Sequence, residues 1–150
     1  MAATVTNVGT NTSTSSSSTL TLGSVTASVG DWLVVMVAAD NAGAGGATAA
    51  TQSASDGAGN TYTLRGNVII RDPGSANDGC EFARFTCEVT SALSGGTITV
   101  NFSPNVTSKA ILAYRVQPGA GETISFFSAG NGSTGSSTTQ GSGSLFTGAD

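Results

Sequence analysis

The chain has 150 residues, of which 38% are hydrophobic and 9% charged, with a formal net charge of −4, so it is long enough for one domain with its own core. Five scattered Lys and Arg residues exclude the clustered basic surface that nucleic-acid binding needs, and no apolar run is as long as a membrane span. The sequence therefore predicts neither a nucleic-acid partner nor a membrane partner.

The N-terminal part of the chain changes from a polar tract to strand-like segments. Residues 1–18 are rich in Thr, Ser and Asn and show no apolar period, so we interpret them as a flexible arm. From Leu20 to Ala27 the apolar residues alternate but change phase at Gly23, which predicts a β-bulge. The unbroken apolar run from Trp32 to Ala39 is typical of a central strand that is covered on both faces.

A long segment of small residues separates this strand from the next. Residues 42–55 are built almost wholly of Ala, Gly, Ser and Thr, and we expect them to form a functional or contact loop. The segment Asp56–Asn60 has the composition of a turn. Between Tyr62 and Arg71 the side chains alternate in polarity, which predicts a strand interrupted at Gly66 and followed by a polar turn at 72–79.

The C-terminal half contains further candidate strands. In the strand expected over residues 80–89, the apolar residues change parity between Phe82 and Phe85, which predicts a second bulge near Ala83-Arg84. The remaining candidate strands are residues 97–102, 110–116 and the short 124–126.

No window of the sequence shows a sustained helical period. Short strands separated by Gly, Pro, Asn and Asp turns predict an all-β protein, an antiparallel, jelly-roll-like β-sandwich with about seven or eight strands and flexible termini rich in Ser, Thr and Gly. We divide the chain into a flexible N-terminal arm (1–18), a β-sandwich domain (19–128) and a Gly/Ser/Thr-rich C-terminal segment (129–150). In the last segment, Leu145-Phe146 begin a possible final strand.

Groups that carry catalysis are sparse. The chain has no histidine, which removes His-based triads and the commonest metal ligand. Ser108 and Lys109 are adjacent, but neighbouring strand residues point to opposite faces, which disfavours a Ser-Lys pair. The nine acidic residues single out no carboxylate pair for glycoside hydrolysis. We therefore expect no enzyme and assign no catalytic residue.

Thiols and carboxylates are the remaining side chains that could form a metal or cofactor site. Cys80 and Cys87 fall on one predicted strand, roughly 20 Å apart at the usual strand rise, so we expect no disulfide but two buried small hydrophobic side chains. Asp72, Asn77 and Asp78 share a loop and carry oxygen atoms of the kind that bind Ca²⁺, but solvated turns have the same composition. We assign no metal-binding or cofactor-binding residue and no cofactor.

Carbohydrate binding would need exposed aromatic rings. The candidates are Trp32, Tyr62, Tyr114 and Phe127. The first three lie inside apolar strand patterns, so we expect them in the core, whereas Phe127 breaks the alternation and is the candidate for an exposed ring.

Four segments occur in a characteristic order: Gly30–Val35, Asp56–Thr63, Gly96–Val100 and Ile111–Tyr114. Together they resemble a family of β-sandwich domains in tailed-phage virion proteins and related bacterial surface proteins, which has a "GDLLVV" strand, a "D-x-x-GNTYT" turn, a "TVTV" strand and a late "A-x-x-Y" strand. The resemblance covers about Val25 to Gln117. It implies a non-enzymatic virion component, either a capsid decoration protein or a tail or fibre module, with no catalytic residues to carry over.

One departure from that family concerns the last strand. Its members often continue with another strand after the Ser/Thr-rich stretch, whereas this sequence stops soon after Leu145-Phe146. That strand is either unfinished, because the chain is part of a longer one, or completes a neighbour's sheet.

The residues and the resemblance lead to one functional hypothesis and one alternative. We expect a bacteriophage virion structural protein, a capsid decoration (cement) protein that binds the major capsid protein or another virion protein as a symmetric homo-oligomer such as a trimer. Because no secretory signal is visible after Met1, we expect it to be made in the host cytoplasm and located in the virion. The alternative is a tail-fibre or surface module that binds carbohydrate or a receptor through residues 42–55 and an exposed ring.

Overall fold

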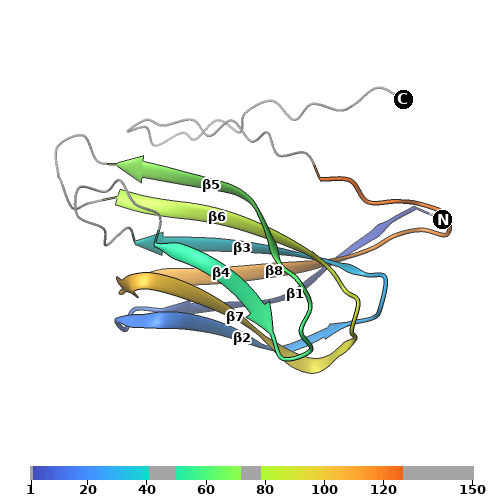
Figure 1. The fold of residues 1–150 in the computed structure, drawn as a ribbon, viewed down its shortest axis with the longest axis horizontal. Coiled ribbons are helices and arrows are strands. Elements are labelled where there is room, and N and C mark those ends of the chain that lie inside the picture. Colours follow the sequence, from blue (N-terminus) through green and yellow to red (C-terminus); the bar gives the residue numbers. More distant parts are fainter. Residues whose placement is uncertain (1, 41–49, 72–78, 127–150) are drawn as a thin grey trace.

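The computed structural model describes residues 2–40, 50–71 and 79–126, and these ranges form two stacked antiparallel sheets (Figure 1). The predicted antiparallel β-sandwich is confirmed, with eight strands in the described ranges. No helix in these ranges is long and apolar enough to cross a membrane. The larger sheet contains, in spatial order, β1 (Thr4–Ser13), β8 (Lys109–Gln117), β3 (Trp32–Asp40), β6 (Gly79–Glu88) and β5 (Thr63–Arg71). The smaller sheet contains β2 (Ser17–Ala27), β7 (Leu93–Val106) and β4 (Thr51–Asp56).

The strands pair in a nested pattern. β1 pairs with β8, β2 with β7 and β3 with β6, so strands early in the chain meet strands late in the chain. Two antiparallel sheets wound in this way are typical of jelly rolls. The innermost pair departs from the pattern, because β4 lies beside β7 and β5 beside β6. Every connection except the one between β5 and β6 therefore passes from one sheet to the other.

The core lies between the sheets and is filled by strand residues of one parity. Leu33, Val35 and Val37 of β3 are fully buried, and Ile98 and Val100 of β7 are fully buried from the other sheet. Burial of each such side chain contributes about 1.5–3 kcal/mol to the free energy of unfolding. The two-residue period of the strands thus builds one hydrophobic core.

The prediction that β3 is covered on both faces is wrong for the described residues. Its alternate residues Trp32, Val34 and Met36 are only partly buried, and Ala38 is exposed. These side chains point to the outer face of the larger sheet, and the three-stranded sheet packs only on the inner face. An unbroken apolar run does not predict which faces of a strand are covered, because the same run occurs in strands that are covered on one face or on both.

The predicted bulge near Ala83-Arg84 is also wrong. The pairing of β6 with β3 is continuous from Trp32↔Glu88 to Asp40↔Cys80. The parity changes in the sequence because Phe82, at 42% exposure, lies on the outer face, whereas Phe85, at 2%, lies in the core. The two other predicted irregularities are confirmed, since the β2–β7 register shifts between Leu22 and Val25, and the β5–β6 register shifts between Leu64 and Gly66.

Two strands were missed because their side chains carry little apolar pattern. Thr4–Ser13, expected to be part of a flexible arm, forms β1 and pairs along β8. Residues 51–55, expected to be part of a loop, and Asp56, expected to begin a turn, form β4 and pair with β7. Strand pairing satisfies backbone N–H and C=O groups whatever the side chains are, so polar strands can line an existing sheet. The predicted short strand at 124–126 does not form.

Some predictions lie outside the described residues. They are most of the loop 42–55, the candidate ion ligands Asp72, Asn77 and Asp78, Phe127, and the pair Leu145-Phe146.

One buried carboxylate joins the two sheets at the end of β3 near Asp40. Glu81 of β6 is 1% exposed. Its carboxylate accepts hydrogen bonds from the amides of Ala50 (2.7 Å) and Thr51 (3.0 Å), at the start of β4, and from Asn67 Nδ2 of β5 (2.8 Å). Each donor is buried or half-buried and needs a hydrogen-bond acceptor within the protein. The Glu81 carboxylate supplies that acceptor, and these bonds hold β4 against the larger sheet.

The opposite orientations of Phe85 and Phe82 lead to a first prediction. We expect Phe85→Ala to lower the free energy of unfolding by about 3–5 kcal/mol, because it opens a cavity in the core. The matched change Phe82→Ala, three residues away on the outer face, should cost less than about 1 kcal/mol. Urea unfolding of both variants measures the difference, and equal losses would contradict the continuous alternation of β6.

The buried carboxylate leads to a second prediction. Glu81→Gln places an NH₂ group among N–H donors, and we expect it to destabilise the fold by about 2 kcal/mol. Glu88→Gln on the same strand is the control, because Glu88 is exposed, and it should change stability by no more than about 0.5 kcal/mol. The midpoints of chemical unfolding report both effects. A Glu81→Gln variant as stable as the parent would show that the carboxylate does not hold β4 in place.

Candidate binding surface

The outer face of the smaller sheet is polar. Its outward side chains are hydroxyls and amides, with Thr19 and Thr21 on β2 and Thr97 on β7 exposed. Asn101 donates from Nδ2 to the Ser53 hydroxyl across β7 and β4 at 3.2 Å. Such a face is well solvated and has little apolar area to bury against another molecule.

The outer face of the larger sheet is apolar over its centre. Cross-strand pairing sets Val34 beside Tyr114 and Met36 beside Leu112, all partly exposed. On the other side of Met36, the half-buried Arg84 of β6 also points outward. Phe82, on the neighbouring strand β6, is exposed. Val68 of β5, Val116 of β8 and Val5 of β1 extend this surface toward both edges of the sheet. We call this surface the apolar face. Contiguous apolar patches of this kind on a soluble domain commonly mark interaction sites.

The chain itself folds back over one end of the apolar face. After β8, the Glu122 amide donates to the Gly119 carbonyl at 3.0 Å, and the Glu122 carboxylate accepts from the Gly119 amide at 2.8 Å. In Figure 1 the orange segment that follows β8 turns back at this point. It brings the Phe126 ring to 5.0 Å from Trp32, between ring centroids, and to 6.0 Å from the Arg65 guanidinium. These ring and cation contacts fix the end of the segment on β3 and β5.

A polar hollow of about 280 Å³ lies on the outer face of the larger sheet, at the end where β3 begins with Trp32. The Arg65 Nε donates to the Thr86 hydroxyl at 2.8 Å, and Glu88 is the direct cross-strand neighbour of Trp32. The hollow therefore combines one indole ring, one guanidinium, one carboxylate and several hydroxyls. Its lining residues are Trp32, Thr61, Thr63, Arg65, Thr86, Glu88 and Thr90.

The turn after β4 holds this end of the sandwich together. The Asp56 carboxylate accepts hydrogen bonds from the Ala58 amide (2.9 Å), from the Asn60 amide (3.2 Å) and side chain (3.0 Å), and from the Tyr62 hydroxyl (2.9 Å). Asn60 Oδ1 in turn accepts from the amides of Thr90 (2.9 Å) and Ser91 (2.8 Å). The connection from β4 to β5 is thus bonded to the connection from β6 to β7. We call this network the Asn60 clamp.

The Asn60 clamp shifts two pKa values in opposite directions. Burial by itself would raise the pKa of Asp56, but the hydrogen bonds from Asn60, Tyr62 and Ala58 together lower it below its ordinary 3.8. Burial raises the pKa of Tyr62 above its ordinary 10.0, and the hydrogen bond to the Asp56 carboxylate and the charge of that carboxylate raise it further. Both shifts favour the ionised Asp56 with a neutral Tyr62 that donates to it.

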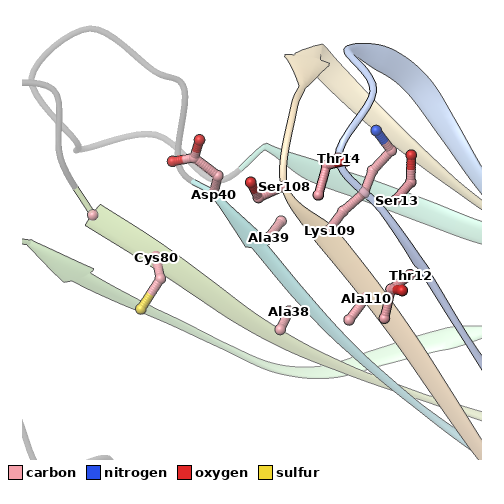
Figure 2. Close-up of a pocket in the computed structure, with 11 residues that line it drawn as sticks. Thr12, Ser13, Thr14, Ala38, Ala39, Asp40, Cys80, Ser108, Lys109 and Ala110 are labelled. Carbon is pink, nitrogen blue, oxygen red and sulfur yellow. The ribbon is translucent and has the colours of Figure 1, made fainter.

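A second hollow of about 430 Å³ lies at the other end of the larger sheet (Figure 2). Figure 2 shows Cys80, Ala38, Ala110 and Thr12 in that order across four neighbouring strands. The hollow exists because the outward side chains here are small, whereas Met36 and Leu112 occupy the next outward positions on β3 and β8. It is an apolar, shallow continuation of the apolar face.

The structure separates the sequence candidates for catalysis. Lys109 is buried and its Nζ donates to the carbonyls of Ser15 (2.7 Å) and Val106 (2.6 Å), while the adjacent Ser108 is exposed. The lysine thus satisfies two backbone carbonyls at a corner of the sandwich. Both cysteines are free and lie on β6 as predicted, but only Cys87 is buried, and Cys80 is exposed on the outer face.

The aromatic candidates are placed differently from the prediction. Trp32 and Tyr114 are partly exposed on the outer face of the larger sheet and do not belong to the core. Tyr62 packs against the core and bonds to Asp56. The polar residues around Trp32 were missed, because the sequence does not show that the starts of β3 and β5 meet the end of β6. In the described ranges, no three Cys, Asp or Glu residues are grouped as a metal site would require.

A scan against protein-family models and searches of curated proteins and of solved structures found no match. The likeness to phage virion domains consequently rests on the four sequence segments alone.

The pKa shifts lead to a third prediction. Because folding raises the pKa of Tyr62, the folded state keeps this proton above pH 10 while the unfolded chain loses it. The stability from Tyr62 is therefore complete below pH 10 and is lost as the pH rises further. Cys87, whose pKa burial raises from 9.0 to about 12, acts in the same direction from pH 9 upward. The stability from Asp56 is present above pH 3.8 and is lost as the pH falls.

The measurement is the melting temperature against pH for the parent and for Tyr62→Phe. We expect the variant to be less stable at neutral pH by about 1.5–3 kcal/mol, because the charged Asp56 carboxylate loses the hydrogen bond that the Tyr62 hydroxyl donates. We also expect a smaller alkaline loss, because one titrating group is gone and Cys87 remains. An unchanged alkaline profile would show that Tyr62 titrates alike in both states.

Proposed function

We propose that this chain is a non-enzymatic bacteriophage virion structural protein, a capsid decoration protein that attaches to the major capsid protein through its apolar face. It acts as a symmetric homo-oligomer such as a trimer, and its location is the virion after synthesis in the host cytoplasm. A module of a tail or fibre would use the same face on a different virion protein.

The single observation that carries this proposal is the contrast between the two outer faces. Val34, Met36, Leu112, Tyr114 and Phe82 give the larger sheet an apolar outer surface, whereas the smaller sheet presents threonine, serine and asparagine. A protein that worked alone in solution would gain nothing from keeping this apolar area in water. Attachment to a partner removes the area from water, and each buried Å² then contributes roughly 25 cal/mol before the cost of association.

Two further features support the same role. Charged residues make up only 9% of the chain, so neighbouring copies repel one another little. Jelly rolls also recur in viral capsid domains, although a fold by itself does not establish a function.

The alternative function is carbohydrate or receptor binding. The sequence predicts its site at residues 42–55, of which 51–55 belong to β4 and 42–49 lie outside the described residues. What favours it now is a different place, the polar hollow beside Trp32.

Attachment to the capsid is tested with virions of the phage that encodes the chain. We expect mass spectrometry to detect the chain in density-purified particles. We also expect purified protein to co-sediment with shells from which it has been removed. Met36→Lys with Leu112→Glu should weaken co-sedimentation at least tenfold, because the new Lys and Glu, although cross-strand neighbours, would both have to leave water on attachment, and their pairing does not offset that desolvation cost.

The matched control changes the other outer face. Thr21→Lys with Thr97→Glu adds the same charges to exposed threonines of the smaller sheet, and co-sedimentation should be unchanged. Absence of the chain from purified virions, or equal binding by both double variants, would refute the proposal. Circular dichroism of each variant verifies that the strands have formed.

A further inference from the structure

We infer that the polar hollow beside Trp32 is a binding subsite for one neutral sugar ring. The inference rests on the chemistry of the lining, on its size and on its rigidity. It does not depend on attachment to a capsid.

The lining offers the groups that a polyhydroxylated ligand needs. Trp32 supplies a partly exposed indole, whose large apolar surface suits the C–H face of a sugar. Glu88 is an acceptor, and the Arg65 guanidinium is a donor that keeps N–H groups beyond the one bonded to Thr86. One positive and one negative side chain leave the hollow without net charge, which favours a neutral ligand over a phosphate or a carboxylate.

Several of these groups have no partner within the described part of the chain. The hydroxyls of Thr61 and Thr63 and the carboxylate of Glu88 make no hydrogen bond to another described residue, and all three residues are exposed. Hydroxyls act as donors and as acceptors, so they match sugar hydroxyls in either direction. The hollow thus presents unused hydrogen-bonding groups around an apolar ring.

The size of the hollow limits what it can hold. At about 280 Å³ it lies just under the usual range of small-molecule pockets, about 300–1,000 Å³. It therefore fits one ring of a saccharide and not a branched oligosaccharide, whose further units would extend into solvent or onto the apolar face.

Hydrogen bonds and ring contacts fix the position of the side chains that line the hollow. The Asn60 clamp fixes Thr90 through both its amide and its hydroxyl, at 2.9 and 3.2 Å from Asn60 Oδ1. Phe126 packs on Trp32 and lies beside Arg65. Because these groups are ordered before a ligand arrives, binding loses less conformational entropy.

The test uses the intact chain and the fact that Trp32 is its only tryptophan. The protein is titrated with glucose, galactose, mannose and N-acetylglucosamine while the indole fluorescence and the single indole N–H signal in a nitrogen–proton NMR spectrum are followed. We expect at least one sugar to change the N–H signal saturably, with a dissociation constant on the order of 1 mM.

Variants of the lining separate this site from nonspecific effects. Glu88→Gln should weaken binding about tenfold and Thr63→Val about fivefold, because each removes or weakens one hydrogen bond. Thr97→Val makes the same change at an exposed threonine of the smaller sheet and should bind as the parent does.

Two outcomes would overturn the inference. One is the absence of a saturable change with any of the four sugars up to about 100 mM, far above a millimolar dissociation constant. The other is sugar binding that Glu88→Gln and Thr63→Val leave unaltered. Neither outcome bears on co-sedimentation with shells, which depends on Met36 and Leu112, so the two proposals can fail separately.

Discussion

The structure depends on the strict two-residue alternation of β3 at the centre of the larger sheet. Leu33, Val35 and Val37 enter the core, and between them Val34 and Met36 point outward. Because β3 pairs with both β6 and β8 without a register shift, the same division is imposed on both neighbours. A slip of one residue would exchange the two faces of the strand. The core and the apolar face are therefore two products of one constraint.

Polar side chains hold the ends of the sandwich together, because the connections between the sheets cannot form the backbone hydrogen bonds of paired strands. At one end the Glu81 carboxylate bonds to the start of β4. At the other, Asp56 and Asn60 bond the crossing segments to one another. Each group accepts from buried or part-buried amides, which would cost free energy if they were left without a partner. The Asn60 clamp also positions Thr90, so a structural network and the wall of the polar hollow share the same residues.

The two proposals use different parts of one sheet. Attachment to a partner uses the aliphatic and aromatic side chains at its centre, which lie beside Arg84 of β6. Sugar binding uses the Trp32 end, where Arg65, Glu88 and threonines surround the indole. The segment that ends at Phe126 lies at this end of the sheet and contacts both Trp32 and Arg65. Under the two proposals, a chain with few charges would bind two chemically different ligands on one sheet.

The sequence by itself determined the all-β class, six of the eight described strands and the register shifts at Gly23 and Gly66, because alternation and turn residues act over a few positions. It also placed a turn at the end of β4, where the Asp56 carboxylate accepts from the amides of Ala58 and Asn60. Tertiary structure alone decided that β1 and β4 are strands, since backbone pairing needs no apolar pattern. It likewise decided that Phe82, Trp32 and Tyr114 face outward. The sequence marks a side chain as apolar, but which side of a sheet receives the second layer depends on residues distant in the chain.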